Sequence, residues 1–256
     1  MKHHRNKQKG PKSGPKLKID LFGVHAAVAA WQNPKRHIHA LYITDEALKG
    51  FDLRSPAKRP APTIVSKEEL ERALPQGTVH QGIALCAQDL EELDVQDLII
   101  QEEKKEKSVF LMLDQVTDPH NVGAILRSAC AFGAAGMILQ RKHAPGLTGI
   151  LAKTACGAVE HVPVAYETNL TRALEKLQDA GYFAIGLDER GEDIAALPEY
   201  SKAVLVLGAE GPGLRRLVRE QCDALACLPM RGPMPSINVS NAAAVALYAL
   251  NNKLFT

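Results

Sequence analysis

The stretch Val109-Phe-Leu-Met-Leu-Asp-Gln-Val-Thr-Asp-Pro-His-Asn-Val-Gly-Ala-Ile-Leu-Arg127 decides the fold of the larger part of this chain. It begins with an unbroken apolar run, passes through a polar loop and enters a helical pattern. A strand that is apolar without alternation is buried on both faces, which is typical of a parallel sheet covered by helices on each side. We therefore expect a strand at Val109–Leu113 and a helix at Val122–Phe132.

The same alternation of short apolar runs and helical patterns continues beyond this stretch. Further strands are predicted at Met137–Leu139, Val162–Val164, Phe183–Leu187, Val204–Leu207 and Leu225–Leu228. Further helices are predicted at Thr148–Ala155, Leu170–Ala180, Leu214–Gln221 and Val239–Leu250. The pattern predicts an α/β fold with a parallel sheet, which binds ligands at the carboxyl ends of its strands.

A smaller mixed α/β unit is predicted at residues 19–87. We expect a helix at Val24–Trp31, a strand at Ala40–Thr44, a helix opened by the capping sequence Ser66–Glu69 and a strand at Ile83–Cys86. The proline-rich stretch Ser55–Pro62 predicts a surface loop. With the segment after Lys107, the chain therefore has two folded units.

The formal net charge of +2 conceals an uneven distribution. Residues 1–18 carry +7, residues 19–87 carry +1, residues 88–107 carry −5 and residues 108–256 carry −1. A tail rich in Lys, Gly and Pro cannot bury enough apolar area to fold, so residues 1–18 are expected to be a disordered basic tail. Residues 88–107 are expected to be an acidic linker. Because the tail lacks the apolar run of a signal peptide, we expect a cytoplasmic protein.

Neither the cysteines nor the histidines predict a metal site. The cysteines are odd in number, irregularly spaced and without a CxxC pair, and are therefore expected to be buried reduced thiols: Cys86, Cys130, Cys156, Cys222 and Cys227. His37 and His39 are the one close histidine pair in the folded part, and no acidic ligand lies at a matching spacing. We expect no metal.

Three stretches place glycines or polar residues just beyond a predicted strand. In the first, Asn121 fits the N-cap of the helix and Arg127 could be a solvated side chain. The second, Leu207–Arg216, holds closely spaced glycines that suit close approach to a ligand, although neither the dinucleotide fingerprint nor the P-loop spacing is present. Glu210 within it could be an ordinary helix N-terminal acid. The third, Leu228–Val245, holds more capping groups than one helix requires.

Together these stretches resemble a known family. Asn121-x-Gly-x-x-x-Arg127, Leu207-Gly-x-Glu-Gly-x-Gly213 and Leu228-Pro-Met with Ser236-Ile-Asn-Val-Ser240 are similar to the three motifs of the SpoU, or TrmH-like, branch of SPOUT RNA 2′-O-ribose methyltransferases. The similarity includes Lys153–Pro163 and covers essentially all of residues 108–250. The N-terminal unit, with Phe22-Gly-Val-His-Ala and His80-Gln-Gly-Ile, resembles the ribosomal-protein-like substrate-binding domain of that family.

The resemblance implies a parallel α/β sheet with a C-terminal deep trefoil knot (the SPOUT α/β knot), a catalytic domain at 108–256 and an RNA substrate-binding domain at 19–87. It implies a homodimer formed through the knot domain and S-adenosyl-L-methionine as cofactor. The implied reaction is 2′-O-methylation of 23S rRNA, at a guanosine in the peptidyl-transferase region. A tRNA ribose methyltransferase and a non-catalytic RNA-binding ribosome-assembly factor are the alternatives, and the presence of every motif residue counts against the latter.

The resemblance also assigns roles to residues. The catalytic positions are Arg127, Asn121, Glu210, Ser236 and Asn238. The cofactor-binding positions are Gly208, Leu228, Met230 and Ile237. In the family the arginine acts as a base or an activator; because arginine stays protonated, we expect Arg127 to hold phosphate and stabilise the developing alkoxide. Which subunit supplies Arg127 stays open. RNA is expected to contact His25, Lys35, Arg36, His37 and His39, together with the basic tail.

Overall fold

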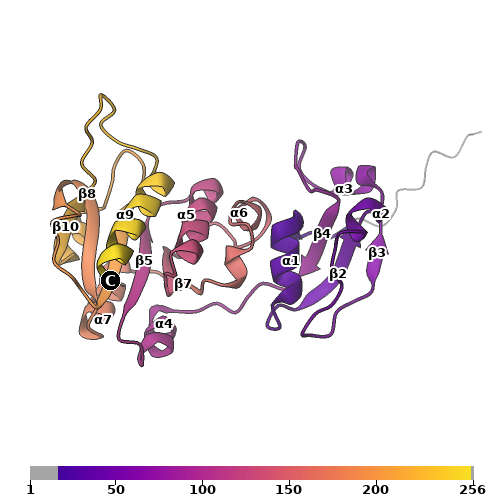
Figure 1. The fold of residues 1–256 in the computed structure, drawn as a ribbon, viewed down its shortest axis with the longest axis horizontal. Helices are drawn as coiled ribbons and strands as arrows, with labels where there is room; N and C mark the ends of the chain where they lie inside the picture. The colour runs from indigo at the N-terminus through magenta and orange to yellow at the C-terminus, as the bar shows by residue number, and fades with distance from the viewer. Residues whose placement is uncertain (1–16, 255–256) are drawn as a thin grey trace, which may run out of the picture.

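The computed structural model describes residues 17–254, so the predicted basic tail lies almost entirely outside the described residues. The strands form two sheets, one of four strands and one of six, which belong to separate units (Figure 1). The four-stranded sheet lies in the N-terminal unit. The six-stranded sheet is formed by the chain from Ser108 onward.

The N-terminal unit has the strand order β1-β4-β2-β3. Its strands are β1 (Leu21–Phe22), β2 (Ile38–Ile43), β3 (Pro62–Ile64) and β4 (Ile83–Ala87). Its helices are α1 (Val24–Gln32), α2 (Asp45–Leu48) and α3 (Lys67–Ala73). Strand β4 pairs antiparallel with β1 and β2, and β3 pairs parallel with β2. The structure confirms the expected helices and strands, including the capping box of Ser66 and Glu69, whereas the expected loop at Ser55–Pro62 ends in strand β3.

Every strand pair of the second sheet is parallel, as predicted. The strand order is β10-β8-β9-β5-β6-β7. The strands are β5 (Ser108–Asp114), β6 (Gly136–Gln140), β7 (Val164–Glu167), β8 (Phe183–Asp193), β9 (Lys202–Gly208) and β10 (Ala224–Cys227). Strand β5 is central: Val109, Leu111 and Leu113 belong to one hydrophobic core, and Phe110 and Met112 to another. Burial on both faces therefore explains the unbroken apolar run.

Two layers of helices cover this sheet. One layer contains α5 (Pro119–Ala131), α6 (Gly149–Thr154) and α9 (Val239–Leu254), of which α5 and α9 lie in front of the sheet in Figure 1. The opposite layer contains α4 (Val95–Glu102), α7 (Leu170–Asp179) and α8 (Arg216–Gln221). A short 3-10 helix, η1 (Ala158–Glu160), follows α6. The expected helices are present, with small shifts at their ends.

The expected acidic linker at 88–107 contains a helix. Helix α4 lies inside it, begun by a capping box of Asp94 and Asp97. Its Val95 and Leu98 side chains are fully buried in the core that covers the second sheet. The second unit therefore begins before Ser108, and the connection between the units is shorter than the charge pattern indicates.

The C-terminal end of the chain returns to the middle of the second sheet. Strand β10 lies at the edge of the sheet, yet α9, which follows it, packs against α5 and the inner strand β9. The α/β fold and the parallel sheet are confirmed. The passage of this returning segment through a loop, which would make the knot, stays a prediction from the resemblance.

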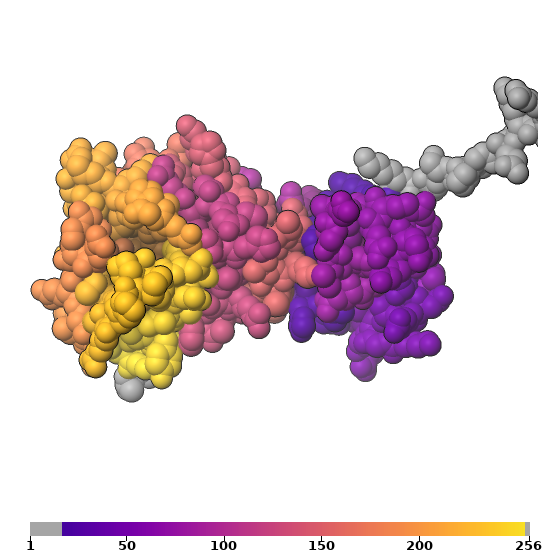
Figure 2. Space-filling view, turned by 90° about the horizontal axis from the view of Figure 1, so that it is seen from above, coloured from indigo at the N-terminus to yellow at the C-terminus, as the bar shows by residue number. Residues whose placement is uncertain are grey.

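A buried ion pair joins the two units, which meet at a narrow junction (Figure 2). Arg36, in the N-terminal unit, donates to Glu160 of η1 at 2.5 Å, and their side chains are 1% and 2% exposed. Asn33 donates to the same carboxylate at 2.7 Å. The expectation that Arg36 contacts RNA is therefore wrong, because its guanidinium is buried against another part of this chain.

The cysteines are less buried than expected. All five are free, but only Cys86 is buried and the other four are partly exposed. None of the helices in residues 17–254 is both long and apolar enough to span a membrane.

Candidate active site at the carboxyl edge of the second sheet

The centre of the site is the loop that follows β9. Strands β5 and β9 end together, since Asp114 is the register partner of Gly208. The loop folds back on itself: the Gly213 N–H donates to the Ala209 carbonyl at 3.0 Å. A Cβ at Gly208 would lie 2.2 Å from the Gly213 carbonyl carbon, so only glycine permits this approach. The fold-back places Glu210 at the tip of the loop.

Asp114 fixes the base of this loop. The Asp114 side chain is fully buried, and it accepts hydrogen bonds from the Arg215 backbone N–H at 2.9 Å and the Arg215 Nε at 2.6 Å. A buried carboxylate needs such partners, because an unpaired charge in the interior is costly. The last residue of β5 therefore holds the glycine loop from the side opposite Glu210.

Helix α5 begins three residues earlier than the sequence indicates, and this changes the function of Asn121. The N-cap is Asp118, whose carboxylate accepts the His120 N–H at 2.9 Å, and Pro119 occupies the first turn. The prediction of Asn121 as N-cap is therefore wrong. Its side chain lies within the first turn and is available for contacts outside the helix.

Asn121, Glu210 and Asn238 form one hydrogen-bonded triangle. Asn238 Nδ2 donates to Glu210 Oε1 at 2.6 Å and to Asn121 Oδ1 at 3.0 Å. Asn121 Nδ2 donates to the same Glu210 oxygen at 3.2 Å. The structure therefore brings together three predicted site residues from three separate motifs.

The third motif is itself held locally. Asn238 Oδ1 accepts the Ser240 backbone N–H at 2.8 Å and the Ser240 hydroxyl at 2.5 Å. With its amide nitrogen on Glu210 and its oxygen on Ser240, the Asn238 side chain is oriented at both ends. An aspartate here could not donate to Glu210 while ionised.

A cavity of about 520 Å³ lies beside the triangle, walled by the middle of β8 and by the segments that follow β9 and β10. All four predicted cofactor positions line it: Gly208, Leu228, Met230 and Ile237. Glu210, Ser236 and Asn238 line it as well. Met230 and Ile237 are 39% and 40% exposed, so they present apolar surface to a ligand.

Arg127 and Asn121 lie outside the lining of this cavity. Asn121 is connected to it through Glu210, whereas Arg127 is exposed on α5 and is joined to no other described residue by a hydrogen bond or ion pair. Its guanidinium is thus available to a ligand that reaches beyond the cavity.

The cavity wall also contains a polar cluster that none of the three motifs includes. Asp188, Glu189 and Arg190 follow the apolar start of β8 and line the cavity. Arg190 donates to both oxygens of Asp188 at 2.7 Å, and these bonds hold the pKa of Asp188 below its usual range. Polar residues directly after a buried run of a parallel strand were the available signal.

The cavity combines backbone, apolar, amide and charged groups. Among residues 17–254, no three His, Cys, Asp or Glu side chains are grouped so that they could hold an ion. The arrangement can bind and orient an organic ligand, and the exposed cation Arg127 lies six residues after Asn121 on α5.

A parallel α/β unit with its cavity among the loops at the carboxyl ends of its strands is the architecture of a known class of RNA-modifying enzymes. Residues 108–248 match the SpoU rRNA Methylase family. A 23S rRNA (guanosine-2′-O-)-methyltransferase RlmB from Coxiella burnetii is 36% identical over 91% of this chain and 95% of its own length. The RlmB from Vibrio cholerae is 38% identical over 89% of this chain and 94% of its own length.

Solved structures share the fold across both units. The AdoMet-bound rRNA methyltransferase from Sinorhizobium meliloti superposes with a TM-score of 0.75 at 21% identity, covering 93% of this chain and 88% of that one. AviRb, a SpoU methyltransferase from Streptomyces viridochromogenes solved with AdoMet, gives 0.72 at 22% identity, covering 91% and 88%. This chain belongs to the SpoU rRNA Methylase family.

Proposed function

We propose that this protein transfers a methyl group from S-adenosyl-L-methionine to a ribose 2′-hydroxyl of RNA, at a guanosine in the peptidyl-transferase region of 23S rRNA. The observation that carries the proposal is the triangle of Asn121, Glu210 and Asn238, which joins the three motifs beside a cavity of about 520 Å³. The relatives named RlmB are similar over nearly the whole chain, which favours rRNA as the substrate.

The cavity fits the cofactor. Leu228, Met230 and Ile237 offer apolar surface for an adenine ring, and the missing side chain at Gly208 lets the backbone of the glycine loop come close. When bound there, the cofactor supplies a methyl group on a positively charged sulfur. The loops that line the cavity would hold this methyl donor in place.

Arg127 and the triangle would act on the RNA. The exposed, unpaired guanidinium of Arg127 suits a phosphate beside the target ribose and the negative charge that develops on its 2′-oxygen. Glu210 is held by two amide donors, so its carboxylate stays in place as a neighbour of the reacting groups. Ser236, in the same wall, completes the polar side of the site.

The N-terminal unit, residues 19–87, would bind the RNA substrate. Lys35 and His37, between α1 and β2, and His39, within β2, are exposed, whereas Arg36 is buried. The basic residues at 1–18 would add sequence-independent attraction to phosphate. This division leaves the weakly acidic second unit to bind the cofactor and one nucleotide.

A homodimer through the second unit and a cytoplasmic location complete the proposal. Val245 and Tyr248 on α9 are 49% and 56% exposed, and apolar side chains one turn apart on a helix beside the site suit a protein interface. A dimer there would bring a second chain close to the cavity. Ribosomal RNA as substrate requires a protein that meets ribosomes or their precursors.

The experiment is methyl transfer with purified protein and labelled S-adenosyl-L-methionine, using unmodified 23S rRNA and, separately, tRNA. We expect label on one ribose of 23S rRNA, located by mapping the 2′-O-methyl group. Transfer to tRNA alone would make the protein a tRNA methyltransferase. Cofactor and RNA binding without transfer to either substrate would make it a non-catalytic RNA-binding factor, and would overturn the proposal.

A further inference from the structure

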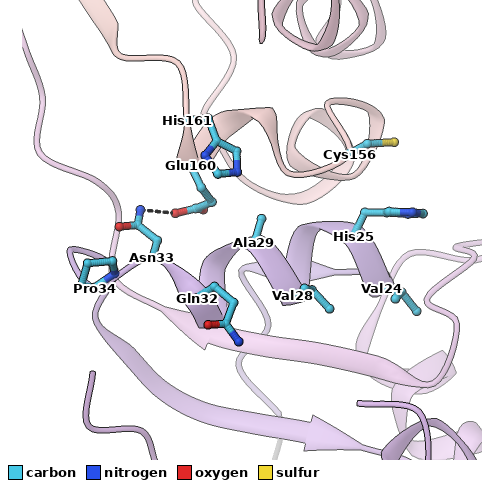
Figure 3. Close-up of a pocket in the computed structure, with 10 residues that line it drawn as sticks. All are labelled: Val24, His25, Val28, Ala29, Gln32, Asn33, Pro34, Cys156, Glu160 and His161. Atoms are coloured by element: carbon cyan, nitrogen blue, oxygen red, sulfur yellow. Dashed lines mark hydrogen bonds between the residues drawn. The ribbon is translucent and has the colours of Figure 1, made fainter. Parts of the chain in front are cut away.

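A second cavity, of about 500 Å³, lies between the two units (Figure 3). One wall is α1 of the N-terminal unit with the residues that follow it, and the other is η1 of the second unit with the residues on either side of it. His25 lies toward one end of the cavity and His161 toward the other. The cavity therefore exists only while the two units are docked.

The floor of this cavity is apolar and uncovered. Val24 and Val28 lie one turn apart on α1, are 39% and 40% exposed, and line the cavity with Ala29. An uncovered apolar strip beside imidazole groups offers flat, weakly polar surface. Such a surface suits an aromatic ring that has polar edges, which is the character of a nucleobase.

The charged groups that line the cavity would not repel a phosphate group. Glu160 is the one acidic residue among the described residues that line it, and its carboxylate is 2% exposed and bonded by Arg36 and Asn33. The other titratable lining groups are His25, His161 and Cys156. Lys35, which is exposed, follows the lining residue Pro34. The cavity therefore has a neutralised acid, two imidazoles and a neighbouring cation.

The two units approach each other closely beside this cavity. Gly157 has a φ of +91°, and a Cβ there would lie 2.7 Å from the Ala29 Cβ and 3.1 Å from the His25 carbonyl oxygen. Glycine thus allows η1 to approach α1, and the buried pair of Arg36 and Glu160 fixes the approach. A preformed cavity loses less entropy when it binds a ligand.

We propose that this cavity binds one unpaired nucleotide of the RNA substrate, with the base on the Val24 and Val28 surface beside His25 and the rest of the nucleotide extending toward His161. Proteins recognise RNA loops by stacking such splayed bases on aromatic side chains. The inference rests on the proposed function for its ligand class. It adds a contact formed by both units, so that RNA bound here would hold the N-terminal unit in register with the active site.

The test uses the full chain with ¹³C,¹⁵N-labelled histidine and a short single-stranded oligoribonucleotide. On titration, the imidazole signals of His25 and His161 shift, while the signal of buried His80 in the N-terminal unit stays unchanged. Val28→Glu, which places a carboxylate on the floor, weakens oligonucleotide binding about tenfold, a typical loss for one stacked base. The matched control is Ile100→Glu on α4, another exposed apolar side chain on a helix, outside both cavities.

Two further measurements separate this inference from its alternatives. Replacing His25 or His161 by alanine lowers affinity equally at low and high salt, because a stacking contact releases no counterions. Unchanged binding by Val28→Glu would overturn the proposal, as would imidazole shifts that follow protein concentration alone, which would mean that a second copy of the chain covers the cavity. Binding here without methyl transfer would reject only the proposed function, and transfer without any response here would reject only this inference.

Discussion

Asn238 donates a 2.6 Å hydrogen bond to Glu210, joining two motifs that lie 28 residues apart. Because Glu210 accepts and Asn238 donates, a single substitution breaks the pair and a double substitution can reverse its polarity. It also places both side chains in the wall of the same cavity. This relationship gives the sharpest test of the site.

Asn238→Asp should lower methyl transfer about 10- to 100-fold, because a carboxylate in place of the amide loses the donor and repels Glu210. Adding Glu210→Gln restores one donor and one charge with reversed polarity, and should recover part of the rate. Single-turnover kinetics measure both variants. Asn241→Asp, in the first turn of α9, is the control. Full activity in Asn238→Asp alone would contradict the role of the triangle.

Arg127→Ala should abolish methyl transfer while leaving cofactor affinity unchanged, because Arg127 lies outside the lining of the cofactor cavity. Calorimetric titration with S-adenosyl-L-methionine and a methyl-transfer assay give the two readouts. Arg172→Ala, another exposed arginine on a helix, should change neither. A loss of cofactor affinity in Arg127→Ala would show that the assigned role is wrong.

Arg215→Ala should lower both cofactor affinity and stability. It leaves Asp114 buried with one of its two hydrogen bonds, which costs roughly 1–3 kcal/mol of unfolding free energy. Urea unfolding and cofactor titration are the measurements. The control is Arg216→Ala, whose ion pair with Glu220 is exposed and should contribute about 0–1 kcal/mol. Equal effects of the two variants would mean that Asp114 does not anchor the glycine loop.

Glu160→Gln should destabilise the docking of the two units by roughly 3–5 kcal/mol, because it leaves the buried Arg36 without its counter-charge. Small-angle scattering and urea unfolding would report a wider distribution of unit orientations and a lower midpoint. Removing the exposed pair of Arg54 and Asp52 through Arg54→Ala should do neither. A double variant with apolar residues at 36 and 160 should regain much of the stability.

Acid should destabilise the N-terminal unit through His80. Burial lowers the pKa of His80 below its ordinary 6.5, so the unfolded chain binds a proton more readily than the folded one. The stabilising contribution is complete above the unfolded pKa and is lost as pH falls below about 6.5. Urea midpoints between pH 8 and 5 should therefore fall more steeply in the unmodified protein than in His80→Gln. Equal slopes would exclude His80 as the cause.

The strands of the second sheet can be predicted from the sequence because each is indicated by residues adjacent in the chain. Each inner strand contains an unbroken apolar run, and burial on both faces follows from that run alone. Helix α4 is harder to predict from the sequence because only part of it is apolar. Acidic residues surround it and also form both halves of its capping box. Its place in the core depends on α7 and β7, which are distant in the sequence.

The site could be predicted in part for the same reason. The motifs identify Asn121, Glu210 and Asn238, but the bonds among them follow from tertiary structure. Arg36 shows the limit: in the sequence it lies in a basic, histidine-rich stretch, and only the approach of Glu160, 124 residues away, buries it. The N-cap of α5 lies three residues before Asn121, at Asp118, because an aspartate side chain can cap a helix as well as an asparagine can.

The three residues of the triangle enter the chain at widely separated times during synthesis. Asn121 and Asn238 lie 117 residues apart, so the amide that completes the triangle is made only after every strand of the second sheet. A nascent chain can already contain the whole N-terminal unit and most of the parallel sheet, yet it has no triangle until the segment beyond β10 has returned to α5. Any chain that ends before Asn238 would thus lack the triangle, however much of the parallel sheet it contains.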